Sequence, residues 1–389
     1  MKTALAAAIG MIAVCVLESQ AARQLQPGSP LLGITSRELE LFRLGLDDFM
    51  EVETAEDGLG PAFNGVSCAA CHSVPAVGGM TSMTEIRAGK RDESGHFTAF
   101  KGGTLFQVFS TPRHRCQVQI PDDANVIAHR MPIPLFGAGL VEAIPDETIL
   151  SLEDPNDRDG DGVRGRANRV NDVATGRDRV GRFGWKSQQA TLLAFAADAY
   201  RNEMGITNDL FPDEFALGID PAQMKLCGAS STVEDVQNRR TGLRGIDNFE
   251  SFMKFLAPIG RGPITDAVIR GESLFRSIGC ASCHTPRIMT GESQNPLFHR
   301  RPVDLFSDLL LHDVGTGDGI EQDGATGGEI RTPALWGLRF RRPLLHDGRA
   351  ATHEQAILRH DAEAAEARKQ FSELTPEKKK DLFAFLNSL

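Results

Sequence analysis

The chain has 389 residues, of which 41% are hydrophobic and 24% are charged, and its formal net charge is −10. Such a length suggests two domains, and the composition is ordinary for a globular protein with a buried core. The acidic balance and the lack of a basic stripe in the sequence argue against a nucleic-acid partner.

The N-terminus has the parts of a secretory signal. Lys2 gives the positive start, residues 4–17 form an apolar run, and Ser19 and Ala21 supply small residues for cleavage. We therefore predict a signal peptide over residues 1–21 and export of the mature chain. A lipoprotein signal at Cys15 is the weaker alternative. No later segment is apolar enough to cross a bilayer, so the mature protein is not expected to be membrane-spanning.

A helix is predicted over residues 36–50, where apolar side chains recur at helical spacing. Thr35 and Glu38 stand three residues apart at its start, which is the spacing of a capping box.

Cys68, Cys71 and His72 then form a C-x-x-C-H, the attachment signature of a c-type haem. Two thiols on one turn add to the two vinyl groups of one porphyrin, and the adjacent histidine faces the iron as its axial ligand. A zinc site or a redox dithiol is the alternative for a single copy. A second copy ending in histidine, in a chain with an export signal, favours covalent haem at both.

The middle of the chain is harder to assign. Residues 73–145 are rich in turns, and short strands are expected within residues 97–109. Helices are expected over residues 188–201 and 247–256, which are rich in apolar residues.

A dense acidic turn contains Asp157, Asp159 and Asp161, followed by Gly162. This matches the start of a calcium loop, because three carboxylates so close together repel one another unless a cation lies among them. The twelfth position, which would supply a bidentate glutamate, is Asn168. We therefore expect a looser calcium turn, with a solvated acidic loop as the alternative.

Two further cysteines, Cys116 and Cys227, remain after the haem cysteines and Cys15 are assigned. In an oxidising compartment such a pair most often forms a structural disulfide, although the sequence cannot prove the pairing.

A Pro- and Gly-rich stretch at residues 258–263 marks the expected domain boundary. A helix over residues 266–278 leads into the second C-x-x-C-H, formed by Cys280, Cys283 and His284. A last helix is expected to open at Thr375. The prediction is a mainly α fold with long irregular loops and two cytochrome c-like domains, residues 22–260 and 261–389, each holding one covalent haem.

Several further motifs accompany the two haem signatures. They lie at residues 60–64 (GPAFN), 135–144, 181–186 (GRFGWK), 331–336 (RTPALW) and 346–350 (HDGRA). With these motifs the chain resembles the bacterial di-haem oxidoreductases within the di-haem cytochrome c peroxidase group. The resemblance implies a periplasmic location and peroxidase chemistry, with the C-terminal haem collecting electrons and the N-terminal haem meeting peroxide.

The resemblance also implies a sixth ligand for the second iron. His360 occupies the position where the peroxidases of this group carry a methionine, so His284 and His360 are the expected ligand pair. His312 and His346 are the main alternatives, and His299 and His353 are further candidates.

For the first iron, the resemblance makes Glu142 the distal carboxylate that moves a proton between the peroxide oxygens. An apolar pocket would raise its pKa and suit it to this task. The first iron is expected to keep an open or water-bound position, because His96, His114 and His129 are unconvincing as removable ligands. The tryptophan that passes electrons between the haems is expected to be Trp185, with Trp336 second.

The favoured hypothesis is therefore an enzyme that reduces hydrogen peroxide with electrons exchanged with a small redox protein. One alternative is a di-haem cytochrome that only transfers electrons. The other is a relative that oxidises an organic substrate or a protein side chain.

Overall fold

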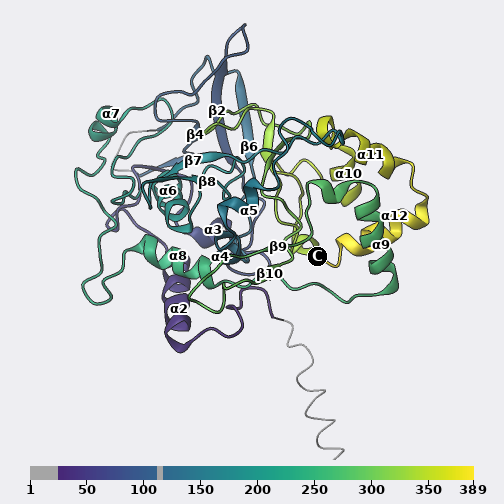
Figure 1. Ribbon diagram of the computed structural model, residues 1–389. Coiled ribbons are helices and arrows are strands. Elements are labelled where there is room, and N and C mark those ends of the chain that lie inside the picture. The colour runs from purple at the N-terminus through teal and green to yellow at the C-terminus, as the bar shows by residue number, and fades with distance from the viewer. Residues whose placement is uncertain (1–24, 112–116) are drawn as a thin grey trace, which may run out of the picture.

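The computed structural model describes residues 25–111 and 117–389 (Figure 1). The predicted signal peptide, Cys15, His114 and Cys116 lie outside the described residues. Cys227 is disulfide-bonded. None of the helices in the described ranges is long and apolar enough to cross a lipid bilayer.

The described residues form eleven α-helices and twelve short strands. The helices are α2 (Ser36–Met50), α3 (Cys68–Cys71), α4 (Ala138–Glu142), α5 (Asp146–Leu150), α6 (Leu192–Met204), α7 (Pro221–Leu226), α8 (Gly245–Phe255), α9 (Asp266–Ser277), α10 (His353–Leu358), α11 (Ala365–Ser372) and α12 (Pro376–Leu386). The strands are β1 (Ala62–Phe63), β2 (Glu85–Arg91), β3 (Phe97–Thr98), β4 (Leu105–Phe106), β5 (Phe109–Ser110), β6 (Val126–Arg130), β7 (Arg169–Asp172), β8 (Arg177–Val180), β9 (Ile288–Met289), β10 (Pro302–Val303), β11 (Leu311–Asp313) and β12 (Glu329–Arg331).

Helix α2 begins as predicted. The Thr35 side chain accepts from the Glu38 amide, and the Glu38 carboxylate accepts from the Thr35 amide, so two otherwise unpaired helix donors are satisfied. Gly45 lets α2 approach α8 closely, since a Cβ there would lie 2.1 Å from the Asn248 carbonyl oxygen. The Phe49 ring packs 4.8 Å from Phe252 at this contact.

The largest sheet is built around β2, which pairs antiparallel with β3, β4 and β6. The antiparallel pairs β1–β5, β7–β8, β9–β10 and β11–β12 make up the other small sheets. The short strands predicted within residues 97–109 are present as β3, β4 and β5.

The apolar core has two large clusters. The main one joins α2, α4, α6 and α8 to residues 288–310, so this part of the predicted C-terminal domain packs against the N-terminal helices. The second cluster lies between α9 and α12, where Phe275 and Phe385 are 5.1 Å apart. Helices α9 to α12 gather at one side of the molecule (Figure 1).

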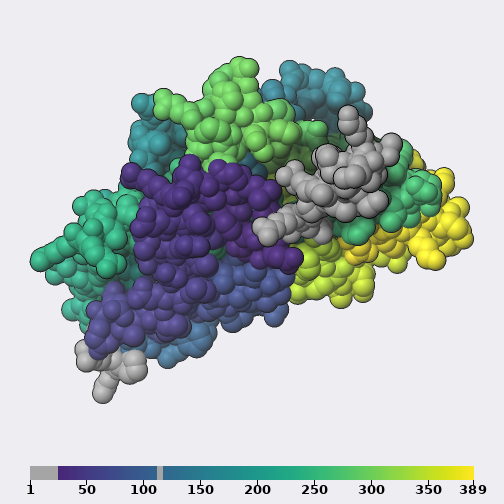
Figure 2. All heavy atoms as spheres, turned by 90° about the horizontal axis from the view of Figure 1, so that it is seen from below, coloured from purple at the N-terminus to yellow at the C-terminus, as the bar shows by residue number. Residues whose placement is uncertain are grey.

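Seen from below, the N-terminal residues in purple cover a large part of one half of the surface, and the C-terminal residues in yellow lie at the opposite end (Figure 2). The two C-x-x-C-H motifs follow the helices on these two sides. Helix α2 leads through residues 51–67 to the first motif, and α9 leads directly to the second.

Candidate functional site

The first C-x-x-C-H lies on one short helical turn. Cys68 and Cys71 begin and end α3, and the His72 amide donates to the Cys68 carbonyl at 3.1 Å. The His72 ring lies 6.2 Å from Phe49 and donates from Nδ1 to the Gly79 carbonyl at 2.9 Å. Burial lowers the pKa of His72, so its ring is neutral and Nε2 keeps a lone pair for a metal.

The second motif repeats this arrangement. Cys280 lies on a 3₁₀ turn (Cys280–Ser282) directly after α9, and the His284 ring lies 6.2 Å from Phe275 of that helix. His284 donates from Nδ1 to the Phe306 carbonyl at 3.0 Å. Burial lowers the pKa of His284 to about 4, so this ring too is neutral and offers Nε2.

The four motif cysteines are free thiols whose pKa values are raised, first of all by burial: to about 12 for Cys68, about 11 for Cys71 and about 12 for Cys280. Because the thiolate is the nucleophile in dithiol chemistry, such thiols are poor redox centres at neutral pH. The spacing of the two thiols and the adjacent histidine is that of a covalent porphyrin attachment.

A cavity of about 470 Å³ adjoins the second motif. Cys280, Cys283, His284 and His360 all line it. His360 follows α10 and donates from Nδ1 to the Ala356 carbonyl at 2.8 Å, which leaves its Nε2 available. The structure therefore brings the predicted ligand pair, His284 and His360, into one cavity.

The other candidate ligands differ from His360. His353 lines the cavity, but its Nε2 accepts from Arg342 at 3.3 Å. His299 is exposed and bonds to the Ser293 carbonyl. His346 lines the cavity with a buried Nε2 that has no hydrogen-bond partner in the described residues. A buried nitrogen without a partner normally needs an explanation. The His346 nitrogen, together with the thiols and imidazoles of the motif and His360, fits a haem in this cavity.

His312 is already occupied by two carboxylates. Its Nε2 lies 2.8 Å from Asp308 and its Nδ1 lies 2.8 Å from Glu363. These hydrogen bonds outweigh burial and raise the pKa of His312 well above its ordinary value, so the ring is an imidazolium without a free lone pair.

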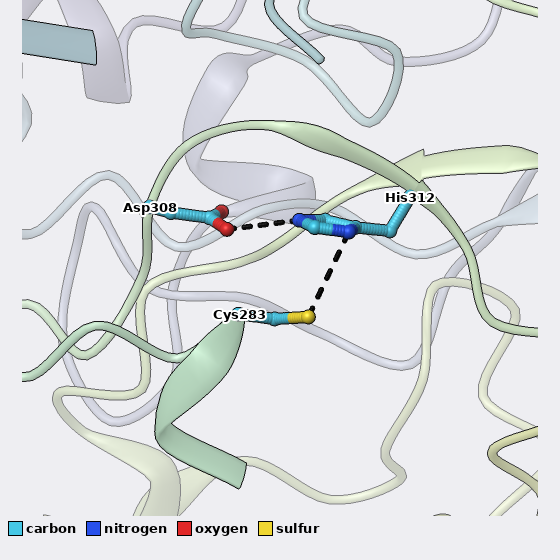
Figure 3. A group of neighbouring side chains, drawn as sticks. All are labelled: Cys283, Asp308 and His312. Carbon is cyan, nitrogen blue, oxygen red and sulfur yellow. Dashed lines mark hydrogen bonds and ion pairs between the residues drawn. The ribbon is translucent and has the colours of Figure 1, made fainter. Parts of the chain in front are cut away.

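The Cys283 thiol lies 3.7 Å from His312 Nδ1, and Figure 3 shows Cys283, Asp308 and His312 turned toward one another. Their ligand atoms are close enough to hold a metal ion. Attachment of Cys283 to a porphyrin as a thioether would remove that use, and a protonated His312 cannot ligate. We interpret His312 and Asp308 as a buried ion pair beside the second C-x-x-C-H.

Replacing His312 with alanine should lower the free energy of unfolding of the haem-loaded protein by about 3 kcal/mol, because it leaves the buried Asp308 and the partly buried Glu363 without their partner. Denaturant unfolding at pH 6 measures this. The stabilisation is complete below the ordinary His312 pKa of 6.5 and is lost as pH rises through the raised value. The difference should therefore shrink at alkaline pH, and His299→Ala, at the exposed histidine, is the matched control.

Glu142 ends α4, and burial raises the pKa of its carboxyl group. Its Oε1 accepts from the Leu192 amide, the first of α6, at 2.7 Å. The backbone carbonyl of Glu142 accepts from Arg182 at 3.3 Å. The expected rise in pKa is present, and the carboxyl group is held at a helix N-terminus.

Trp185 lines the large cavity and donates from Nε1 to the Met131 carbonyl at 2.8 Å. Its ring lies 6.0 Å from His346, edge-on at 68°. Trp336 instead lines a smaller neighbouring cavity of about 50 Å³. The structure thus places Trp185, and not Trp336, in the wall of the cavity at the second C-x-x-C-H.

The acidic turn brings ligand oxygens of Asp157, Asp159 and Asp161 within 4.8 Å of one another. Asn168, at the twelfth position, is buried elsewhere and donates to the Lys186 carbonyl at 2.9 Å. Asp161 also lines the large cavity, so the turn borders the cavity at the second C-x-x-C-H.

A family model described as "Di-haem oxidoreductase, putative peroxidase" matches residues 107–389. No curated protein matches the chain. A solved MauG-like protein associated with microbial copper homeostasis is 16% identical, with 95% of this chain and 94% of that chain covered and a TM-score of 0.43. A variant of the di-haem peroxidase BthA from Burkholderia thailandensis is 15% identical, with 90% and 85% covered and a TM-score of 0.40. Hydrazine synthase from Kuenenia stuttgartiensis is 16% identical, with 95% and 97% covered and a TM-score of 0.41. The family match spans well over half of the sequence and confirms the resemblance seen in its motifs: this chain belongs to the di-haem oxidoreductase family.

Proposed function

We propose that this family member is an exported peroxidase that reduces hydrogen peroxide to two waters with two electrons and two protons. Cys68, Cys71 and His72 would hold the haem c that supplies the site for peroxide. Cys280, Cys283 and His284 would hold the haem c that supplies the electrons. The family match supports the class of enzyme. The histidines around the two motifs differ, and this difference supports the assignment of peroxide reduction to one haem and electron supply to the other.

That difference is a second imidazole. His360 shares the cavity of His284, so a haem there would have two protein ligands. Near the first motif in sequence, the two described histidines point elsewhere: His96 is exposed in the β2–β3 hairpin, and the exposed His129 contacts Thr84 at 3.2 Å. A haem held by His72 would then keep one face open for a small substrate.

When bound, the two haems supply iron that exchanges electrons and, at an open face, binds peroxide. The chain supplies the rest. The Gly79 and Phe306 carbonyls orient the His72 and His284 rings, and this type of hydrogen bond raises ligand basicity. Glu142 offers a largely buried carboxyl group whose raised pKa suits it to accept a proton and return it, as general acid–base catalysis requires. Trp185 stands in the wall of the second cavity as the aromatic group for electron passage.

The proposal includes a periplasmic location and a small redox protein as electron donor. The apolar run at residues 4–17 and the two covalent haem signatures support export, because c-type haem and a disulfide at Cys227 both suit an oxidising compartment. The net charge of −10 favours a donor with a basic face.

Turnover of the protein produced in a host that matures c-type cytochromes tests this function. We expect peroxide-dependent oxidation of a reduced soluble cytochrome. Electron transfer without peroxide consumption would instead identify a transfer cytochrome. Oxidation of an organic substrate or a partner side chain, without turnover of the cytochrome, would identify the protein as an enzyme that oxidises that substrate or side chain.

We further propose that Asp157, Asp159 and Asp161 bind one calcium ion. Replacing Asp159 and Asp161 together with asparagine should weaken calcium binding by on the order of tenfold or more, because affinity follows the number of charged ligands. Equilibrium dialysis of the metal-free protein against calcium measures this. Asp123→Asn, at an exposed aspartate paired with Lys90, is the control, and equal affinities would contradict the assignment.

A further inference from the structure

Two arginines form part of the wall between the two cavities. Arg331 ends β12 and Arg341 follows the 3₁₀ turn Leu338–Phe340. Both residues line the cavity of about 470 Å³ at the second haem position and also the neighbouring cavity of about 50 Å³. Neither has a role in the function proposed above.

The two guanidinium groups have carbonyl acceptors but no counter-ion. Arg331 donates to the Gly184 and Thr332 carbonyls at 2.8 and 3.2 Å. Arg341 donates to the Ala334 carbonyl at 2.6 Å. In residues 25–111 and 117–389, no carboxylate lies within ion-pair distance of either side chain. Asp308 acts on Arg331 from further away and is already paired with His312.

Elsewhere this fold pairs its buried cations. Arg130 and Lys186, both almost fully buried, lie 2.7 and 3.2 Å from Asp318. Arg182, fully buried, pairs with Asp146. Arg331 and Arg341 depart from this rule, and both line the cavity of about 470 Å³, where one anion could reach both.

The missing counter-ion has a physical cost. Burial, and for Arg331 also the charge of Arg341, lowers the pKa of both arginines to about 10. Both stay charged at neutral pH, so the fold holds two neighbouring cations, Arg331 buried and Arg341 partly buried, without a carboxylate partner. A buried charge is normally compensated by a partner, and the planar guanidinium group matches a carboxylate with two parallel hydrogen bonds.

We propose that Arg331 and Arg341 form a carboxylate-binding site, and that its ligand is a propionate of the haem attached to Cys280 and Cys283. This inference rests on the proposed function only for the presence of that haem, and it needs no peroxide turnover. The two charges favour the reduced iron, because the oxidised iron carries one more positive charge. They therefore raise the midpoint potential of the electron-supplying haem and make that haem easier to reduce.

The test is a spectroelectrochemical titration of the low-spin haem in the haem-loaded protein. Arg341→Gln should lower the equilibrium constant for reduction about tenfold, which is about 59 mV for a one-electron couple. Arg341→Lys keeps a charge and should recover most of the shift. Arg339→Gln is the matched control: Arg339 also donates to backbone carbonyls, but it lines neither cavity.

Acetate added during the titration separates two sources of the carboxylate. A potential that is independent of acetate, and lower in Arg341→Gln, identifies the propionate. A potential that changes with acetate in the unaltered protein but not in Arg341→Gln identifies a free carboxylate ligand and overturns the propionate assignment.

An unchanged potential in Arg341→Gln overturns the site altogether. If that variant does not fold, Arg331→Gln, which removes the other charge in the same cavity wall, is compared with the parent protein, and an unchanged potential in Arg331→Gln overturns the proposal. Peroxide turnover is recorded in parallel, so that failure of the proposed function is seen separately.

Discussion

Replacing His360 with alanine is expected to convert the low-spin haem of this protein to a high-spin form. His360 lines the same cavity as His284, and its Nδ1 is held by the Ala356 carbonyl, so Nε2 is the atom offered to the iron. Without it, the second iron would keep His284 alone from the protein. The optical spectrum of the reduced protein and the EPR spectrum of the oxidised protein both report this change.

The loss of the His360 ligand should also slow the delivery of electrons to the first haem. A change of axial ligand moves the potential of a haem over a wide range, so peroxide turnover with a cytochrome donor should fall by at least an order of magnitude. His353→Ala is the control, because His353 lines the same cavity with its Nε2 engaged by Arg342. If His346→Ala changes the spectrum and His360→Ala does not, the ligand is His346.

Replacing Glu142 with glutamine should lower kcat/KM for peroxide by about 10²- to 10⁴-fold, the usual contribution of a positioned proton donor or acceptor. Glutamine keeps an oxygen that can accept from the Leu192 amide, so the end of α4 should stay in place. Both haem spectra should remain unchanged, since Glu142 is not an expected iron ligand.

The pH profile gives a second readout for Glu142. Burial raises the pKa of this carboxyl group, and the ionised form accepts the first peroxide proton. The rate should therefore rise as pH increases through this raised pKa, and this limb should be missing from Glu142→Gln. Glu147→Gln, at an exposed position on α5, should behave like the parent protein. A normal rate in Glu142→Gln would remove Glu142 from the mechanism.

The features that the sequence predicts well are local ones. The capping box of α2 needs only Thr35 and Glu38, and α9 follows from apolar residues at helical spacing up to Cys280. The helix predicted to start at residue 188 starts at Leu192 instead, because Thr191 caps it by accepting from the Ala194 amide. His360 could be predicted as the partner of His284 because it follows the motif at residues 346–350, which is one of those that carry the family resemblance.

The features that the sequence could not give depend on contacts between distant segments. His312 meets Asp308 four residues away, a spacing that could have been noticed, but Glu363 arrives from 51 residues further along the chain. The pairing of β2 with β6 joins short irregular segments with no strong alternation. Residues 288–310 fill the main core although they follow the predicted boundary, so the division at residues 260 and 261 stays a prediction.

The EPR spectrum of the oxidised, haem-loaded protein, recorded before and after one equivalent of hydrogen peroxide, examines the central claim in one experiment. Two haems with unequal ligation should give one low-spin signal and one high-spin signal, and peroxide should remove the high-spin signal. Two low-spin signals that peroxide leaves unchanged would contradict the account, because the protein would then lack an iron with an open face.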